Sequence, residues 1–288
     1  MTTASRYPLA ATLISLVSVQ VGAAFAKTLF PQVGPEGVAA LRLGISAVIL
    51  VIWLRPWTLR LSRSNSLALL GYGMVMAMMN LLIYRAFDTI PVGIAISIEV
   101  LGPLSVALIT SRRRLDVLWV CLALAGVALL PFGSMGASLD LRGVGYAALA
   151  GMFWGLYLIV GKKTAPLGGR GVAVGMSVAA LMVVPLGMAH AGMKLLTTDV
   201  LLFGLLVALL SSAMPFLLDM FALKHLPRHV FGVLMSASPA VSAMAGWLIL
   251  GEHLNGFQWM GIAGISIACL GSALASRESS KESTTGTG

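Results

Sequence analysis

Four charged residues lie inside long apolar stretches of the chain and are the first candidates for chemistry: Lys27, Arg42, Glu99 and Asp219. A charged side chain at the centre of a lipid bilayer costs about 2.5–3.5 kcal/mol, so each of them needs a partner or a function. Glu99 is the most informative. Pro103, four residues later, removes a helical hydrogen bond and crowds the Glu99 carbonyl. A carboxylate beside a freed carbonyl indicates a proton, ammonium or amino-acid site.

Arg42 and Glu99 fall at similar depths in their apolar stretches. They lie about seven and eight residues from the same side, roughly 10–12 Å at 1.5 Å per residue. The two charges can neutralise each other as a structural ion pair. They can also belong to a transport pathway, and the two interpretations overlap if protonation of Glu99 breaks the pair. The sequence leaves both open.

The other two charges lie nearer the ends of their stretches. Lys27 is about one helical turn from an end, where its side chain can reach the interface, although a place in the pathway stays open. Asp219 is close to Lys224, His225 and Arg228 in the sequence, which favours a solvated contact at the interface. Neutral polar residues inside the stretches are either pathway residues or hydrogen-bond partners between helices. Those assigned to the pathway are Asn80, Tyr84 and Ser236, with Pro103 and Pro239 as helix breaks.

The elements that position these residues must be membrane helices. Of the 288 residues, 58% are hydrophobic and 10% are charged, too few charges to cover a water-soluble protein of this size. The apolar stretches of the sequence are uninterrupted, which indicates membrane helices rather than the strands of a barrel, in which polar and apolar residues alternate. The net charge of +9 is spread in short clusters, which argues against nucleic-acid binding. Ten spans are predicted, at 8–30, 35–54, 66–86, 91–110, 115–133, 141–161, 170–190, 198–222, 229–250 and 256–276.

The positions of the lysines and arginines predict the orientation. If the N-terminus is cytoplasmic, 14 of the 19 basic residues fall on the inner side, including Arg112, Arg113 and Arg114. Positive loops resist translocation, so both termini are expected in the cytoplasm. An alternative in which the N-terminal stretch is a signal peptide ending at Ala26 would leave nine spans.

The chain also contains an internal repeat. A shift of 136 residues places Pro91 on Pro227 and Pro103 on Pro239 without a gap. Two five-helix repeats, 8–133 and 141–276, follow, with a disordered cytoplasmic tail at 277–288. Because five is odd, the second repeat starts on the opposite side of the membrane and is inverted. Inverted repeats are typical of secondary transporters whose substrate site lies near the midplane.

Three stretches carry a resemblance to a known family: Val17–Gly44, Thr89–Arg113 and Phe231–Leu254. Together they resemble the bacterial threonine/homoserine exporters of the drug/metabolite transporter superfamily, and the last stretch, with Pro239 and Gly251-Glu252, carries the EamA-domain signature. The resemblance implies an inner-membrane carrier of ten helices that expels small amino acids at the expense of the proton gradient.

The predicted function is therefore export of small neutral amino acids, with protons as the coupling ion and the lipid bilayer as surroundings. Export of another metabolite or a drug, or metabolite uptake, stays open within the same class. A membrane enzyme or a non-transporting assembly partner is the alternative from a different class. No phosphate loop, zincin helix or nucleophile elbow occurs in the sequence, so neither catalysis, a metal nor a cofactor is predicted. The oligomeric state is left undetermined.

Overall fold

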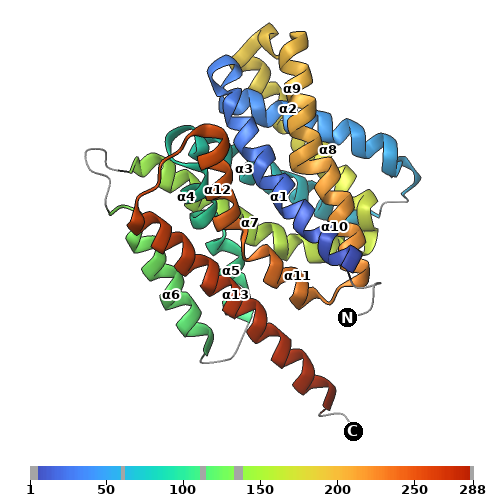
Figure 1. Cartoon of the computed structure of the whole chain (residues 1–288). Coiled ribbons are helices and arrows are strands. Elements are labelled where there is room, and N and C mark those ends of the chain that lie inside the picture. Colours follow the sequence, from blue (N-terminus) through green and yellow to red (C-terminus); the bar gives the residue numbers. More distant parts are fainter. Residues whose placement is uncertain (1–5, 60–61, 111–114, 133–138, 286–288) are drawn as a thin grey trace.

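The structure is a computed structural model, and it describes the chain except for residues 1–5, 60–61, 111–114, 133–138 and 286–288. The described residues form helices joined by short turns and contain no strand, as the sequence predicts (Figure 1). The basic residues Arg60 and Arg112–Arg114 lie outside the described part. In chain order the elements are α1 (Arg6–Thr28), α2 (Phe30–Leu54), η2 (Pro56–Thr58), α3 (Arg63–Thr89), α4 (Val92–Glu99), α5 (Leu101–Thr110), α6 (Leu115–Leu129), α7 (Leu141–Thr164), η3 (Ala165–Leu167), α8 (Gly168–Ala191), η4 (Gly192–Leu196), α9 (Thr198–Ala208), η5 (Leu209–Ala213), α10 (Met214–His225), α11 (Arg228–Met235), α12 (Ser238–Leu250) and α13 (Gly256–Thr285).

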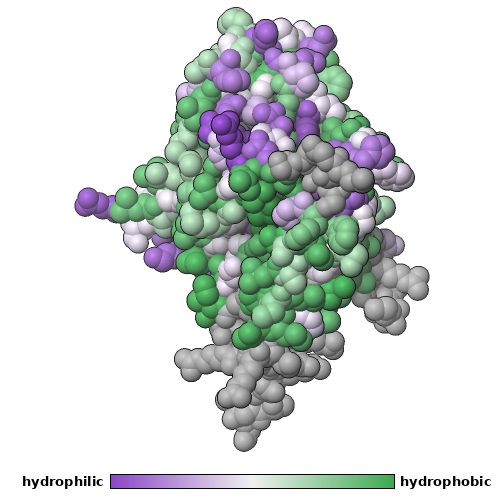
Figure 2. All heavy atoms as spheres, turned by 90° about the vertical axis from the view of Figure 1, so that its left-hand side faces the viewer, coloured by the Kyte–Doolittle hydropathy of each residue, from purple (hydrophilic) through white to green (hydrophobic). Residues whose placement is uncertain are grey.

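Seven helical segments of the described chain are long and apolar enough to cross a membrane. One of them, Leu141–Leu196, is 56 residues long and contains two predicted spans, α7 and α8, joined by η3. Shorter apolar helices, Val92–Ala107 and Val117–Leu129, occupy the fourth and fifth predicted spans. Figure 2 shows apolar side chains across the broad middle of one face and hydrophilic residues gathered toward its upper end. A multi-pass membrane protein follows, while the count of ten spans stays a prediction.

Two of the predicted spans, 91–110 and 229–250, are interrupted near their middles. α4 ends at Glu99 and α5 begins at Leu101, while α11 ends at Met235 and α12 begins at Ser238. A proline has no N–H for the carbonyl four residues earlier, and its ring crowds that carbonyl. Pro103 and Pro239 therefore disrupt the hydrogen bonding at both interruptions. Irregular backbone at membrane depth is tolerated where it is buried in protein or lines a cavity.

The backbone repeats where the sequence repeats. The bounds of α4 and α11 are 136 residues apart at both ends, which is the shift that aligns the prolines. Pro91 and Pro227 begin the two helices with (φ, ψ) of (−57°, 141°) and (−59°, 139°). Val100 and Ser236 end them at (−64°, −15°) and (−63°, −17°). Two segments far apart in the chain thus share the same interrupted-helix geometry.

α7 packs against the first of these interruptions through glycine. A Cβ on Gly151 would lie 2.6 Å from the Glu99 carbonyl oxygen, and a Cβ on Gly102 would collide with the Gly151 carbonyl. A Cβ on Gly155 would lie 3.1 Å from the Val106 side chain. The Gly151-xxx-Gly155 pair therefore brings α7 into backbone contact with the α4–α5 junction, the close-approach use that such spacing favours.

The segment predicted as the span 198–222 contains a local change of helix type. α9 continues into η5, a π-helix of five residues, and then into α10, whose first turn contains Pro215. A π-helix shifts the hydrogen-bond register by one residue and is frequent at functional sites. Nothing in the apolar pattern of this segment predicted the π-helix.

The C-terminal helix is longer than expected. The segment 277–288 is predicted to be disordered, but α13 continues to Thr285 and projects from the body of the molecule (Figure 1). Helix continues because no glycine or proline interrupts the sequence between Gly271 and Gly286. Residues 286–288 lie outside the described part.

Candidate functional site

A cavity of about 330 Å³ lies among the helices, and both halves of the chain line it. α1, α2, α3 and α4 contribute from the N-terminal half, and α7, α8, η5, α10 and α12 from the C-terminal half. Much of the wall is apolar, with Met76, Met79, Phe87, Trp154 and Phe216 among its larger side chains. The polar and charged lining residues are Gln20, Arg42, Asn80, Glu99, Tyr157, Ser211, Ser212, Asp219 and Ser238. The sequence predicted Arg42, Asn80 and Glu99 for the site.

The guanidinium of Arg42 is held by neutral groups from two other segments. Its Nε donates to Ser212 Oγ at 3.0 Å, and its Nη2 donates to the Ser211 carbonyl at 2.9 Å. Its Nη1 donates to Asn80 Oδ1 at 2.9 Å. None of these acceptors carries a charge. They fix the orientation of the guanidinium, and no carboxylate among the described residues forms an ion pair with it.

The Ser211 carbonyl is available because of Pro215. In an α-helix this carbonyl would accept from the N–H four residues later, but Pro215 has no N–H. Arg42 Nη2 supplies a donor for this carbonyl from α2. The signal that could have revealed this contact is the run Ser211, Ser212 and Pro215 inside an otherwise apolar segment.

α3 supports the guanidinium from the other side through Asn80 and Tyr84. Asn80 accepts from Arg42, and its own Nδ2 donates to the Met76 carbonyl at 2.8 Å, which fixes the amide orientation. The Tyr84 ring centroid lies 5.6 Å from the Arg42 Cζ, a distance at which cation and ring attract. Tyr84 is fully buried and does not line the cavity. The two residues therefore hold Arg42 in place, and only Asn80 is also exposed to the cavity.

Glu99 lies at the last position of α4 and lines the cavity, with 6% of its surface exposed. Within the described part of the chain, no hydrogen bond or ion pair reaches its carboxylate, and Arg42 bonds elsewhere. A direct Arg42–Glu99 ion pair, one of the two interpretations of the sequence, is not formed. Equal depth along two helices does not place two side chains face to face, because it leaves the rotation of each helix open. Glu99 is thus a buried carboxylate that faces the cavity without a hydrogen bond or ion pair from any described residue.

The structure places Ser236 and Lys27 away from the cavity lining. Ser236 ends α11, and its Oγ donates to the Val233 carbonyl at 2.6 Å. Ser238, two residues later at the start of α12, lines the cavity in its stead. Pro239 lies beside Ser238 at the helix interruption. The α11–α12 junction therefore reaches the site through a residue that the sequence analysis did not select.

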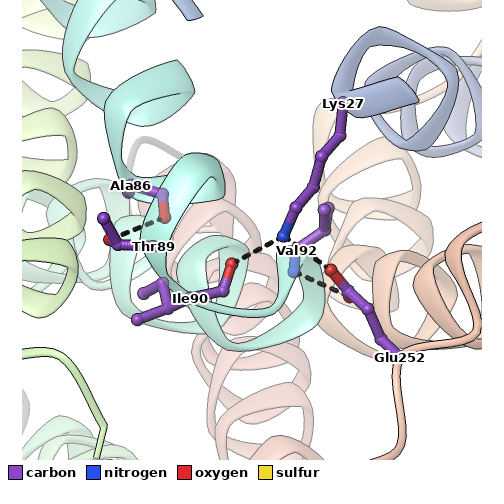
Figure 3. Close-up of polar contacts among 6 residues, drawn as sticks. All are labelled: Lys27, Ala86, Thr89, Ile90, Val92 and Glu252. Carbon is purple, nitrogen blue, oxygen red and sulfur yellow. Dashed lines mark hydrogen bonds and ion pairs between the residues drawn. The ribbon is translucent and has the colours of Figure 1, made fainter. Parts of the chain in front are cut away.

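Lys27 joins three separate parts of the fold. Its Nζ lies 2.8 Å from Glu252 Oε1 and donates to the Ile90 carbonyl at 3.2 Å, while Glu252 Oε2 accepts from the Val92 N–H at 2.9 Å (Figure 3). Glu252 follows α12, and Val92 begins α4. The side chain is therefore not extended freely to an interface; it ties the end of α1 to the start of α4 and to the α12–α13 connection.

Asp219 is the charged residue that sequence reasoning placed wrongly. It lines the cavity from α10, and the Ser15 side chain of α1 lies beside it. Its Oδ1 is buried without a hydrogen-bond partner, and no ion pair joins it to a described side chain. Lys224 and His225 are exposed instead, and His225 Nδ1 lies 2.8 Å from the Phe221 carbonyl. The cavity thus combines one guanidinium with two carboxylates and can hold a small ligand that carries both signs of charge.

The chain matches the model of a known protein family, and it is also similar to individual known proteins. Residues 141–274 match the family model described as the EamA-like transporter family. The chain is 44% identical over 272 residues to the threonine/homoserine exporter RhtA of Salmonella typhimurium strain SL1344, covering 94% of this chain and 92% of the relative. It is 43% identical over 276 residues to RhtA of Escherichia coli K12, covering 95% and 94%.

A solved structure, titled only as the crystal structure of a protein, shares the fold. It aligns with a TM-score of 0.65 at 18% sequence identity, and the alignment covers 93% of this chain and 98% of that one. The agreement therefore extends over nearly the whole of both chains.

Proposed function

Since the chain belongs to the EamA-like transporter family and its relatives span nearly its whole length, we propose that it exports threonine, homoserine and similar small neutral amino acids. This agrees with the resemblance found in the sequence. The family consists of transporters rather than enzymes, as the absence of catalytic motifs predicts. The membrane is the bacterial inner membrane, and the substrate passes through the cavity between the two halves.

The observation that carries the proposal is the Arg42 guanidinium at the cavity. It is partly buried, held in place by several hydrogen bonds and surrounded by neutral acceptors. Arginine presents a planar set of donors that matches a carboxylate in a bidentate manner. An amino acid that enters the cavity therefore meets a preformed positive group for its carboxylate, and the apolar wall accepts a short side chain.

Glu99 serves as the proton site in this proposal. Its carboxylate faces the cavity without a hydrogen bond or ion pair from the described part of the chain, and an ionisable group inside a membrane span is by default a functional group. A proton on Glu99 reduces the negative charge of the cavity. Movement of protons down their gradient then coincides with movement of substrate in the opposite direction.

We further propose that the chain forms two inverted five-helix repeats, 8–133 and 141–276. Together they comprise ten spans, and both termini lie in the cytoplasm. The 136-residue shift that relates the bounds of α4 and α11 supports the duplication, and the excess of basic residues on one side supports the orientation. The interruptions at Glu99–Leu101 and Met235–Ser238 are the flexible points around which the cavity opens to either side.

Purified protein in proteoliposomes tests the proposal. Labelled threonine outside vesicles that are preloaded with unlabelled threonine should exchange inward, and an imposed pH gradient should drive net accumulation. Vesicles without protein and vesicles challenged with a large amino acid such as tryptophan are the controls. A wild-type protein that exchanges neither threonine nor homoserine would contradict the substrate assignment; exchange without any response to the pH gradient would contradict proton coupling.

A further inference from the structure

We infer that Asp219 binds the ammonium group of the substrate, at the opposite end of the cavity from Arg42. This inference rests on the proposed function, because it assigns the second charged group of an amino acid to a residue in the same cavity. Asp219 lies on α10, and neither its position in the sequence nor the similarity of the chain to its relatives assigns it a role.

The first support is the face that η5 and α10 turn toward the cavity. Five residues of this continuous helical segment line it: Ser211, Ser212, Pro215, Phe216 and Asp219. From Ser212 onward the spacing is i, i+3, i+4 and i+7, which describes a single helix face over two turns. The face is polar at its two ends and apolar between them. Ser212 at one end contacts Arg42, and Asp219 at the other end is a carboxylate.

The second support is length. Seven residues separate Ser212 from Asp219, about 10 Å along a helix that rises 1.5 Å per residue. The carboxylate and ammonium of an α-amino acid are attached to the same carbon. With a charge-assisted hydrogen bond of about 2.8 Å at each end, the arginine and the aspartate that hold such a ligand lie roughly 8–10 Å apart. The apolar middle of the face, Pro215 and Phe216, then lies along the substrate.

The third support is the state of the Asp219 carboxylate. Its Oδ1 is buried and has no hydrogen-bond partner, which costs free energy unless a ligand compensates. Nearby cationic side chains do not compensate it, since Asp219 forms no ion pair with a described residue. An ammonium group supplies three donors and a positive charge, so it satisfies the carboxylate when substrate is present.

Glu99 is the other carboxylate on the cavity, but its position suits a different role. The charge of Arg42 acts on Glu99, so an ammonium group bound at Glu99 would also be exposed to the repulsion of the guanidinium. Asp219 instead lies two helical turns from the Ser212–Arg42 contact. We therefore assign the ammonium group to Asp219 and leave Glu99 as the proton site.

The test compares two inhibitors of labelled threonine exchange in proteoliposomes. One is unlabelled threonine, and the other is 3-hydroxybutyrate, which has the same carbon chain and hydroxyl but no amino group. In the wild type, threonine should inhibit at a concentration about ten- to a hundredfold lower than 3-hydroxybutyrate, the ratio expected for a hydrogen bond to a charged group. In Asp219→Asn this ratio should fall toward one, with the change in the threonine value rather than in the 3-hydroxybutyrate value.

Asp199→Asn is the matched control, because Asp199 is an exposed aspartate in the first turn of α9. It should keep the wild-type ratio. Binding of both compounds to detergent-solubilised Asp219→Asn, measured by calorimetry together with its unfolding temperature, separates lost recognition from lost folding. A folded Asp219→Asn that keeps the wild-type ratio overturns the inference, and so does a lost ratio in Glu99→Gln with a retained one in Asp219→Asn. Failure of the wild type to exchange threonine contradicts the proposed function instead.

Discussion

Arg42 Nη2 lies 2.9 Å from the carbonyl oxygen of Ser211 and donates to it from α2, where the α-helical donor is missing because position 215 is a proline. The contact joins a side chain of the N-terminal half to the backbone of the C-terminal half. It holds the guanidinium at the cavity without neutralising it. The contact with the π-helix thus keeps a positive charge at the cavity, where a ligand can bind it.

Arg42→Lys should impair both recognition and stability. A lysine has one nitrogen and cannot reach Ser212 Oγ, the Ser211 carbonyl and Asn80 Oδ1 together. We expect the half-saturating threonine concentration to rise about tenfold or more, and the free energy of unfolding to fall by about 1–3 kcal/mol from unsatisfied buried acceptors. Exchange kinetics and thermal unfolding measure the two effects. Arg142→Lys, at an exposed site near the start of α7, should change neither.

Glu99→Gln should uncouple transport from protons. Glutamine keeps the shape of the side chain and removes its titration, so threonine exchange should persist while accumulation driven by a pH gradient disappears. Labelled threonine flux, with and without the gradient, measures both. Asp88→Asn, at an exposed position near the end of α3, should behave as the wild type. A Glu99→Gln protein with wild-type accumulation would show that the coupling proton binds elsewhere.

Gly151→Ala should be more damaging than Gly145→Ala in the same helix. A Cβ at Gly151 would lie 2.6 Å from the Glu99 carbonyl oxygen, whereas a Cβ at Gly145 meets nothing within 4 Å. Overpacking typically costs about 1–3 kcal/mol, so the unfolding temperature of Gly151→Ala should fall. Gly145→Ala should be neutral or slightly stabilising, because alanine favours helix by roughly 1 kcal/mol. Equal behaviour of the two variants would contradict the backbone contact.

Lys27 and Glu252 should show energetic coupling. The pair is partly buried, with side chains 22% and 12% exposed, and Glu252 also accepts the Val92 N–H. Removing either charge leaves the other without its partner, so Lys27→Met and Glu252→Gln should each destabilise the protein. The double variant should lose less stability than the two single losses combined, by about 0.5–3 kcal/mol. A double-mutant cycle of unfolding free energies measures the coupling, and strictly additive losses would exclude it.

Features governed by local rules were predictable from the sequence. Apolar runs gave an all-helical membrane protein, and proline chemistry placed the interruptions beside Pro103 and Pro239. Arg42, Asn80 and Glu99 were predicted as site residues because a polar side chain inside a membrane span is costly unless it has a partner or a function. All three line one cavity.

Features that depend on helix rotation and on distant partners were not predictable in the same way. The similar depths of Arg42 and Glu99 in their predicted spans suggested that the two residues pair, but the Arg42 guanidinium bonds to η5 instead. The partner of Lys27 is 225 residues away in the chain. Asp219 was assigned by its neighbours in sequence, although the i, i+3, i+4, i+7 spacing from Ser212 would have placed it on the cavity face.

The contact between Gly102 and Gly151 has a mechanical consequence. Where two backbones touch, independent sliding or tilting of the helices is restricted, so we expect the α4–α5 junction and α7 to move together. In the same way Gly22 of α1 fits against Ser211, where a Cβ would lie 2.9 Å from the serine Cβ. The first helix of each half, α1 or α7, is therefore packed against a segment of the other half. In the proposed transport cycle we therefore expect the moving bodies to be mixed in sequence, so that the boundary between the two proposed repeats is not the boundary between the moving parts.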